Sequence, residues 1–271
     1  RRRPGAVLGL GGFVTGPGGV AAWLLRRPLV IHEQNAVAGL TNRLLARLAH
    51  RVLEAFPGSF PGGIATETVG NPVRAEITGL PAPAERFTDR SGSLRILVIG
   101  GSLGAQALNE TVPAALARLP AEPAVQIRHQ AGRDKETPTR AAYAMAGVEA
   151  RVTPFIDDMA EALGWADLVI CRAGALTVSE LAAAGLGAVL VPYPHAVDDH
   201  QTRNARYLDE AGAARLLPQA GLSADSLASV LKELLEEGRE GLLKMAEAAR
   251  RLARPDATPR VAGTCLEVVH G

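Results

Sequence analysis

The residues with the clearest capacity for chemistry lie between Cys171 and Glu180. The apolar run Asp167-Leu168-Val169-Ile170 predicts a strand, and the small residues that follow it, including Gly174, predict a turn into a helix. A helix that begins at such a turn leaves its first backbone N–H groups unpaired, and these groups favour a phosphate. Glu180 lies within the first turns, where its carboxylate can accept hydrogen bonds from two ribose hydroxyls. The stretch favours a nucleotide site, with an ordinary amphipathic helix and a dipole-compensating Glu as the alternative.

A second glycine-rich segment, Gly100 to Ala105, follows the predicted strand 94–99 and precedes a predicted helix over 105–117. Ser102 can donate to an anion there, and the helix start faces the same point. The glycine spacing differs from that of the dinucleotide fingerprint, and the Lys-Ser/Thr ending of a P-loop is absent. We therefore expect a phosphate-facing loop of another kind, and no NAD.

Polar side chains follow the ends of two further predicted strands. Asn35 closes the group His32-Glu33-Gln34-Asn35 after the strand 28–31, and Gln201 closes a loop after the strand 188–194. An amide offers both a donor and an acceptor to a sugar hydroxyl, so both residues are candidates for sugar recognition. His32 by itself is more typical of a hydrogen-bonded structural residue than of a catalyst. His195, Asp198, Asp199 and His200 share the second loop but lack a standard ligand spacing, so no metal site is expected.

Three other positions complete the candidates. Arg74 can reach a pyrophosphate or belong to a linker, and the sequence leaves both open. Ile156 can form a wall for a flat base whose edge is read by backbone groups. Asp157 and Asp158 precede a predicted helix that runs to Trp165, and we interpret them as caps or dipole partners rather than metal ligands.

Strands and helices alternate along the chain, which predicts parallel sheets covered by helices. In the first unit, the strand 7–10 and the glycine-rich loop 11–19 precede a predicted helix over 18–25. With 271 residues the chain fits one large or two medium α/β domains. The proline-rich segment from Pro72 to Glu85 lacks apolar periodicity, and we place the domain boundary there, between residues 1–80 and 81–271. Helical patterns over 227–235, 242–252 and 261–269 close the second domain, or the last packs back on the first.

The composition of the chain limits which classes of partner we expect it to bind. The 29 basic and 28 acidic residues give a net charge of +1, which argues against nucleic acid. Two distant cysteines without ligand spacing indicate buried thiols in a reducing compartment. No apolar run reaches the roughly 18 residues of a membrane span. Trp23 with Arg26 and Arg27 fits an anionic membrane surface, or equally a buried tryptophan beside solvated arginines.

A set of motifs in the same order along the whole chain resembles glycosyltransferase family 28, the bacterial transferases of peptidoglycan synthesis. The motifs are Gly11-Gly12-Phe13, His32-Glu33-Gln34-Asn35, Gly70-Asn71-Pro72-Val73-Arg74, Gly100-Gly101-Ser102-Leu103-Gly104-Ala105, Phe155-Ile156-Asp157-Asp158-Met159, Gly174-Ala175-Leu176-Thr177-Val178-Ser179-Glu180 and His200-Gln201. The resemblance implies an α/β fold of GT-B type, with two Rossmann-like domains whose parallel sheets face a cleft. It also implies inverting transfer of N-acetylglucosamine from UDP-N-acetylglucosamine to the muramoyl sugar of undecaprenyl-pyrophosphate-linked lipid I, giving lipid II.

By the same resemblance, the donor-binding set is Asn35, Arg74, Ser102, Ile156, Ala175, Leu176, Thr177, Val178, Ser179, Glu180 and Gln201. Ser102 and the helix start would hold the diphosphate, Glu180 the ribose, Ile156 the uracil, and Asn35 with Gln201 the sugar. No cofactor or metal is implied. The partners would be the UDP-sugar, lipid I and the cytoplasmic side of the bacterial cell membrane, where the enzyme would be peripheral.

Two departures from the family pattern matter. The Gly-Thr-Gly-Gly-His loop that usually opens the family is absent, so the resemblance implies an incomplete N-terminal domain and a general base outside these residues. Phe13 stands where the family commonly has Tyr. We therefore leave the catalytic residue unknown and expect donor binding without transfer. The alternatives are a UDP-N-acetylglucosamine epimerase, a nucleotide-sugar-binding subunit that needs a partner and, least of all, a hydride-transfer enzyme.

Overall fold

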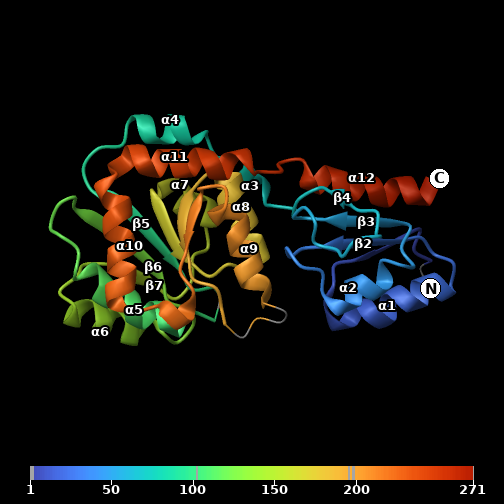
Figure 1. Ribbon diagram of the computed structural model, residues 1–271, viewed down its shortest axis with the longest axis horizontal. Helices are drawn as coiled ribbons and strands as arrows, with labels where there is room; N and C mark the ends of the chain where they lie inside the picture. The colour runs from blue at the N-terminus through green and yellow to red at the C-terminus, as the bar shows by residue number, and fades with distance from the viewer. Residues whose placement is uncertain (1–2, 102, 195, 197–198, 271) are drawn as a thin grey trace.

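Two parallel sheets organise the chain, each in its own α/β unit, as Figure 1 shows. The computed structural model describes residues 3–101, 103–194, 196 and 199–270. All strand pairs in both sheets are parallel. Parallel pairing needs a crossover between successive strands, and helices provide most of these crossovers here.

The first unit has a four-stranded sheet in the order β1-β2-β3-β4. Its strands are β1 (Val7–Gly9), β2 (Leu29–Glu33), β3 (Arg51–Glu54) and β4 (Glu67–Thr68). Helices α1 (Gly12–Leu24) and α2 (Leu40–Leu45) cover one face, where Ala22 and Leu45 pack with Leu29 and Ile31. Strand residues alternate between faces, so Val30 faces the opposite side.

The second unit has a six-stranded sheet in the order β10-β9-β8-β5-β6-β7. Its strands are β5 (Leu94–Ile99), β6 (Val125–Gln130), β7 (Arg151–Thr153), β8 (Leu168–Cys171), β9 (Gly187–Leu190) and β10 (Ala214–Leu216). The order places β8 beside β5, where the direction of winding reverses. In open α/β sheets, ligands bind beyond the carboxyl ends of the strands at such a point.

Helices cover both faces of the second sheet. Leu97, Val169 and Leu190 face a core that includes Leu163 of α7 and Leu181 of α8. On the other face, Ile96 and its neighbours pack with residues of α5, α10 and α11. The helices and the short 3₁₀ segment are α3 (Ala75–Thr78), α4 (Pro83–Thr88), α5 (Gln106–Leu116), α6 (Glu136–Met145), α7 (Met159–Trp165), α8 (Ala175–Ala184), α9 (His200–Asp209), η2 (Gln219–Gly221), α10 (Ala224–Glu236) and α11 (Gly238–Arg251).

The final helix, α12 (Ala257–His270), returns to the first unit. Val261 packs in one cluster with Val30, Leu53 and Val69, so α12 covers the face of the first sheet opposite α1 and α2. Both chain ends therefore lie on the first unit in Figure 1. The chain passes between the units twice, once after the first sheet and once between α11 and α12.

Two local predictions are wrong. The segment 11–19 is mostly helix, because α1 begins at Gly12 and carries Pro17 inside it rather than at its start. Within this segment, only Gly11 (87°) and Gly12 (76°) have the positive φ angles that favour glycine, so the turn ends there. The proline-rich segment also contains helices: Pro83 opens α4, where its missing N–H is no loss, and α3 packs on α7 and α8.

Candidate functional site

The site is built around the point where β8 leads into α8. All four residues of β8 are buried, and Gly174 is the N-cap of α8, with φ −62° and ψ 146°. Gly174 has no side chain with which to cap the helix, so the N–H groups of the first turn point outward without a side-chain acceptor from the cap. The structure thus gives the strand, turn and helix that the sequence predicts, with an anion-favouring helix start at the switch point of the sheet.

Ala173, just before this turn, is held by two side chains of α9. Its N–H donates to Gln201 Oε1 at 3.2 Å, and its carbonyl accepts from Asn204 Nδ2 at 3.2 Å. Gln201 Oε1 also accepts from the Tyr193 N–H at 2.9 Å. Because two backbone donors occupy this oxygen, the NH₂ group of Gln201 is the part of the side chain left to make further hydrogen bonds, as a donor.

Asn35 lies in the loop after β2 and contacts the same helix from the first unit. Its Oδ1 accepts from Asn204 Nδ2 at 3.2 Å, and its backbone N–H and Nδ2 donate to Glu33 Oε1 at 2.9 and 3.3 Å. Glu33 Oε2 accepts from Asn42 Nδ2 at 2.8 Å. The structure therefore brings Asn35 and Gln201, far apart in sequence, to one junction.

Arg74 and Glu180 meet on the same side. Arg74 Nη2 donates to Glu180 Oε1 at 3.0 Å, while the side chains are 54% and 23% exposed. The second carboxylate oxygen of Glu180 has no hydrogen-bond partner among the described residues. A carboxylate with an open oxygen can accept from a diol, and a neighbouring guanidinium can reach a phosphate.

The run Ala175 to Glu180 divides into two sets. Val178 is fully buried, and its N–H donates to Gly174 O at 2.9 Å, so its side chain supports the helix. Ser179 Oγ donates to Ala175 O and accepts from Asn71 Nδ2, both at 3.0 Å, so it serves the contact between the units. Val178 is the buried member, while Ala175, Leu176, Thr177, Ser179 and Glu180 are partly or fully accessible.

The glycine loop after β5 is set by close backbone packing. A Cβ on Gly104 would lie 1.9 Å from Ala131 O, and Gly104 also has a φ of +68°. Asn109 Nδ2 donates to the same carbonyl at 2.9 Å, and Asn109 Oδ1 contacts His129 Nε2 at 3.0 Å. These contacts position the loop at the carboxyl end of β5. Ser102 lies outside the described residues, so its predicted place in this loop stays a prediction.

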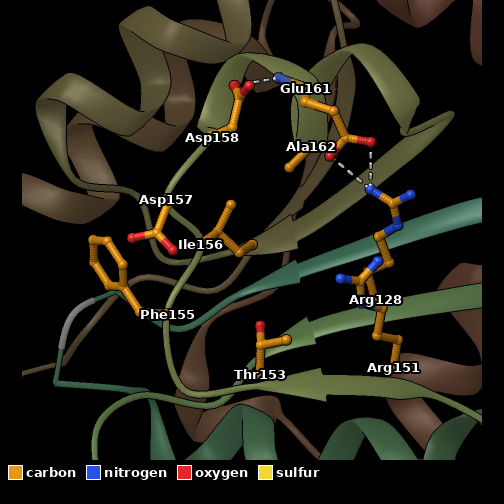
Figure 2. Close-up of a pocket in the computed structure, with 9 residues that line it drawn as sticks. All are labelled: Arg128, Arg151, Thr153, Phe155, Ile156, Asp157, Asp158, Glu161 and Ala162. Carbon is orange, nitrogen blue, oxygen red and sulfur yellow. Dashed lines mark hydrogen bonds and ion pairs between the residues drawn. The ribbon is translucent and has the colours of Figure 1, made fainter.

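Ile156 lines a cavity of about 310 Å³, which Figure 2 shows with its lining residues. Asp158 Oδ1 accepts from the Glu161 N–H at 2.8 Å, which confirms Asp158 as the N-cap of α7. Arg128 donates to both carboxylate oxygens of Glu161 at 2.8 Å. No hydrogen bond to the backbone of Ile156 occurs within the described part of the chain, so its N–H and carbonyl remain open to a base edge.

His32 is fully buried, and its Nε2 lies 2.9 Å from Gly70 O. Burial lowers the pKa of His32 below its usual value. The imidazole therefore favours the neutral form and ties β2 to the segment after β4, as the structural interpretation expects.

Of the predicted 195–201 loop, His195 and Asp198 lie outside the described residues. Across the residues that the structure does describe, no three potential metal-ligating side chains gather in one place.

Three residues that the sequence analysis did not select belong to this junction: Glu33, Asn71 and Asn204. Asn71 Nδ2 donates to Gln34 O at 2.9 Å as well as to Ser179. Asn204 follows Gln201 by three residues on α9, so both face the same way. That spacing places Asn204 on the same side of α9 as Gln201 and could have marked it as a candidate. Its partner, the loop around Asn35, comes close only in the folded chain.

Sequence profiles match both parts of the chain. The Glycosyltransferase family 28 N-terminal domain matches residues 1–54, and the Glycosyltransferase family 28 C-terminal domain matches residues 95–261. A UDP-N-acetylglucosamine–N-acetylmuramyl-(pentapeptide) pyrophosphoryl-undecaprenol N-acetylglucosamine transferase of Marinobacter nauticus is 60% identical over 271 residues, which is 100% of this chain and 74% of that protein. The transferase of the same name from Chromohalobacter salexigens is 61% identical over 265 residues, covering 97% of this chain and 72% of the relative.

Solved structures are similar to this chain as well. The crystal structure of Acinetobacter baumannii MurG superposes with a TM-score of 0.88 at 46% identity, covering 97% of this chain and 73% of that chain. A UDP-GlcNAc 2-epimerase from Neisseria meningitidis, bound to UDP-GlcNAc, superposes with a TM-score of 0.66 at 14% identity, over 97% of this chain and 76% of the other. At that identity the likeness shows the shared fold alone.

Two α/β units with parallel sheets, joined at a helix start and a set of polar side chains, define a glycosyltransferase of GT-B type. The chain belongs to glycosyltransferase family 28. It spans about three quarters of the length of the relatives that it matches.

Proposed function

We propose that this protein transfers N-acetylglucosamine from UDP-N-acetylglucosamine to lipid I and thereby forms lipid II in peptidoglycan synthesis. The observation that carries this proposal is the 60% identity over all 271 residues to a transferase named for that reaction. In the transfer, a hydroxyl of the muramoyl sugar gives its proton to a general base and attacks the anomeric carbon of N-acetylglucosamine. The bond from that carbon to the diphosphate breaks, UDP leaves, and the configuration at the anomeric carbon is inverted.

Charge develops on the diphosphate as UDP leaves, and donors already oriented toward it stabilise the transition state. The N–H groups at the start of α8 supply such donors, and we assign Arg74 and Ser102 to the same group. Glu180 accepts from the ribose hydroxyls, for which its second carboxylate oxygen is open. The open backbone of Ile156 reads uracil. The catalytic base stays unassigned.

The sugar is recognised by Asn35 and Gln201 in this proposal. Gln201 donates through its NH₂ group, because its oxygen is occupied by two backbone donors. Asn35 retains one acceptor position on Oδ1 and one N–H on Nδ2 after its contacts with Asn204 and Glu33. Hydroxyls of the sugar both donate and accept, so these two amides complement them.

Titration calorimetry tests donor recognition. We expect UDP-N-acetylglucosamine to bind more tightly than UDP, and NAD not to bind. Comparable binding of NAD would contradict the assignment of the site.

Transfer itself is tested with a soluble lipid I analogue and the longest form of the protein that its gene encodes. UDP should appear only when the analogue is present. Interconversion of the sugar without any acceptor would instead support the epimerase alternative.

We further propose that the protein works at the cytoplasmic face of the cell membrane as a peripheral enzyme. Within the described residues, no helix has the length and apolar character to cross a bilayer. Trp23, Leu24 and Leu25 at the end of α1 are 51%, 66% and 72% exposed, and the exposed Arg26 follows directly. Apolar and aromatic side chains beside basic ones suit an anionic lipid surface.

Sedimentation with vesicles tests this surface. Replacement of Trp23, Arg26 and Arg27 by Ala should abolish binding to anionic vesicles. The control is Met145→Ser, which removes an apolar side chain that is 89% exposed on the second unit. Equal binding by the triple variant and the control would contradict the membrane assignment.

The two units have separate roles in this proposal. We propose that residues 1–80 form the acceptor and membrane side and that residues 81–271 form the donor side, with α12 as a structural support of the first sheet. The packing of α12 on β2 and its neighbours supports this last assignment.

A further inference from the structure

Asn204 lies between the two units and has no contact with solvent. Its Oδ1 accepts from the Ala36 N–H at 2.8 Å, across 168 residues of sequence. Its Nδ2 donates to Asn35 Oδ1 and to Ala173 O, both at 3.2 Å. One buried amide thus connects the loop after β2 to the residue that leads into α8.

The orientation of this amide is fixed by its partners. A backbone N–H can only donate and a backbone carbonyl can only accept, so Ala36 and Ala173 determine which end of Asn204 is oxygen and which is nitrogen. Both N–H bonds of Nδ2 are then used. Because a buried polar group without a partner is unfavourable, this arrangement is strongly preferred over a flipped one.

The same reasoning fixes Asn35. Its Oδ1 faces a donor on Asn204, and its Nδ2 faces the acceptor Glu33 Oε1 at 3.3 Å. A rotation of the Asn35 amide would place its oxygen against the Glu33 carboxylate and its NH₂ against the NH₂ of Asn204. Asn35 is therefore held from both units at once, by Glu33 from the first and by Asn204 from the second.

We infer that Asn204 is a positioning residue that aligns Asn35 with the start of α8, so that the sugar of the donor is recognised only when both units hold it together. The inference rests on the proposed donor function. Asn204 is fully buried, so it does not face the ligand, and it acts through Asn35 and Ala173. Its contribution should therefore be larger for the sugar, which is recognised through Asn35, than for the uridine diphosphate, whose other proposed contacts, Ile156 and Glu180, do not touch Asn204.

The test compares binding of UDP and of UDP-N-acetylglucosamine to Asn204→Ala and Asn204→Asp. The Asp variant keeps the volume and the acceptor for Ala36 but places an oxygen against Asn35 Oδ1 and Ala173 O, so it separates positioning from a cavity. For both variants we expect the Kd for UDP to stay within about threefold, while the Kd for the UDP-sugar rises about tenfold toward that of UDP. Arg206→Ala, an exposed change on the same helix, is the control and should alter neither value.

A double-mutant cycle with Asn35→Ala shows whether Asn204 acts through Asn35. Once Asn35 is removed, the Asn204 change should have little further effect on the UDP-sugar, which makes the two losses strongly non-additive. Hydrogen exchange gives a readout without ligand: amides in residues 34–39 should exchange faster in both Asn204 variants than in Arg206→Ala.

Three results would overturn the inference: additive losses, an equal loss of UDP and UDP-sugar binding, or unchanged exchange in residues 34–39. The failure of the proposed function has a different signature. In that case the unmodified protein itself would not prefer the UDP-sugar over UDP.

Discussion

Arg74 and Glu180 form an ion pair at 3.0 Å that joins the segment after the first sheet to α8 of the second unit. The same two residues are proposed to bind different parts of the donor, the diphosphate and the ribose. In the structure they bind one another through Glu180 Oε1, so a nucleotide that engaged both carboxylate oxygens would have to compete with Arg74 for this one. A pair this exposed contributes at most about 1 kcal/mol to stability, so little stability is lost if Arg74 releases Glu180.

Glu180→Gln tests the ribose contact. The amide keeps the shape but accepts more weakly than a carboxylate, so we expect the affinity for UDP to fall about tenfold. The affinity for 2′-deoxy-UDP should fall less, because that ligand lacks one of the two hydroxyls. Thermal unfolding should change little. If the variant discriminates between the two nucleotides as strongly as the unmodified protein, Glu180 does not bind the ribose.

Gly104→Ala tests the packing of the glycine loop, with Gly92→Ala as its matched control. Both glycines have a positive φ, +68° and +70°, but a Cβ at Gly104 meets Ala131 O at 1.9 Å while a Cβ at Gly92 meets nothing within 4 Å. The shared backbone strain is about 1–2 kcal/mol. We expect Gly104→Ala to lose a further 1–3 kcal/mol or so of unfolding free energy in denaturant titrations. Equal losses in the two variants would contradict the close backbone contact.

His129 should make the stability depend on pH. Burial lowers its pKa to about 4, from 6.5 for an unperturbed His. Asn109 Nδ2 donates to Ala131 O, so Asn109 Oδ1 accepts from His129 Nε2, and His129 Nδ1 accepts from the Tyr143 hydroxyl at 2.8 Å. The neutral ring satisfies all these contacts.

The unfolded chain binds the proton more tightly than the folded one, so the stability due to His129 is complete above pH 6.5 and is lost as the pH falls toward 4. The loss amounts to at most about 3 kcal/mol. His129→Gln should flatten the dependence of unfolding free energy on pH over this range, although His32 contributes in the same direction. His50→Gln, at an exposed position, is the control. A steeper or unchanged slope in His129→Gln would refute this account.

The two thiols should differ in reactivity. Cys171 is fully buried in β8, and burial raises its pKa to about 12; Cys265 on α12 is half-buried, with a pKa raised by burial as well. The thiolate is the reactive form, so alkylation of the native protein should modify Cys265 slowly and Cys171 only after unfolding. Peptide mass spectrometry after iodoacetamide treatment measures both. Modification of Cys171 before Cys265 would show that the core of the second sheet opens in the native state.

Local patterns predicted much of the second unit. The strand over 94–99 has the predicted bounds, because a run of branched apolar residues, interrupted by Arg95 near its start, specifies a strand buried on both faces. The turn at Gly174 and the start of α8 after it were predicted equally well. The position of Pro17 was not predictable, since a proline near glycines favours a helix start while α1 accommodates Pro17 in its interior.

The candidate site was only partly visible. Asn35 and Gln201 were recognisable because amides at strand ends are available to ligands. Asn204 was not, because its role depends on a contact with Ala36 that forms only when the two units meet. The residues proposed to bind the sugar thus carry a local signal in the sequence, whereas the residue proposed to align them does not.

The two chain crossings between the units lie side by side, and this restricts how the molecule can move. A Cβ on Gly70, in the first crossing, would lie 2.4 Å from the Cβ of Arg254 in the second. Two crossings in contact join the units at one place, which restrains the units from sliding apart. The junction of Asn35 with Asn204 is tied to the same place, because Asn71, next to Gly70, donates to Gln34 O at 2.9 Å and to Ser179 Oγ at 3.0 Å. The residues proposed to meet the sugar are therefore anchored close to the point where the two units are joined.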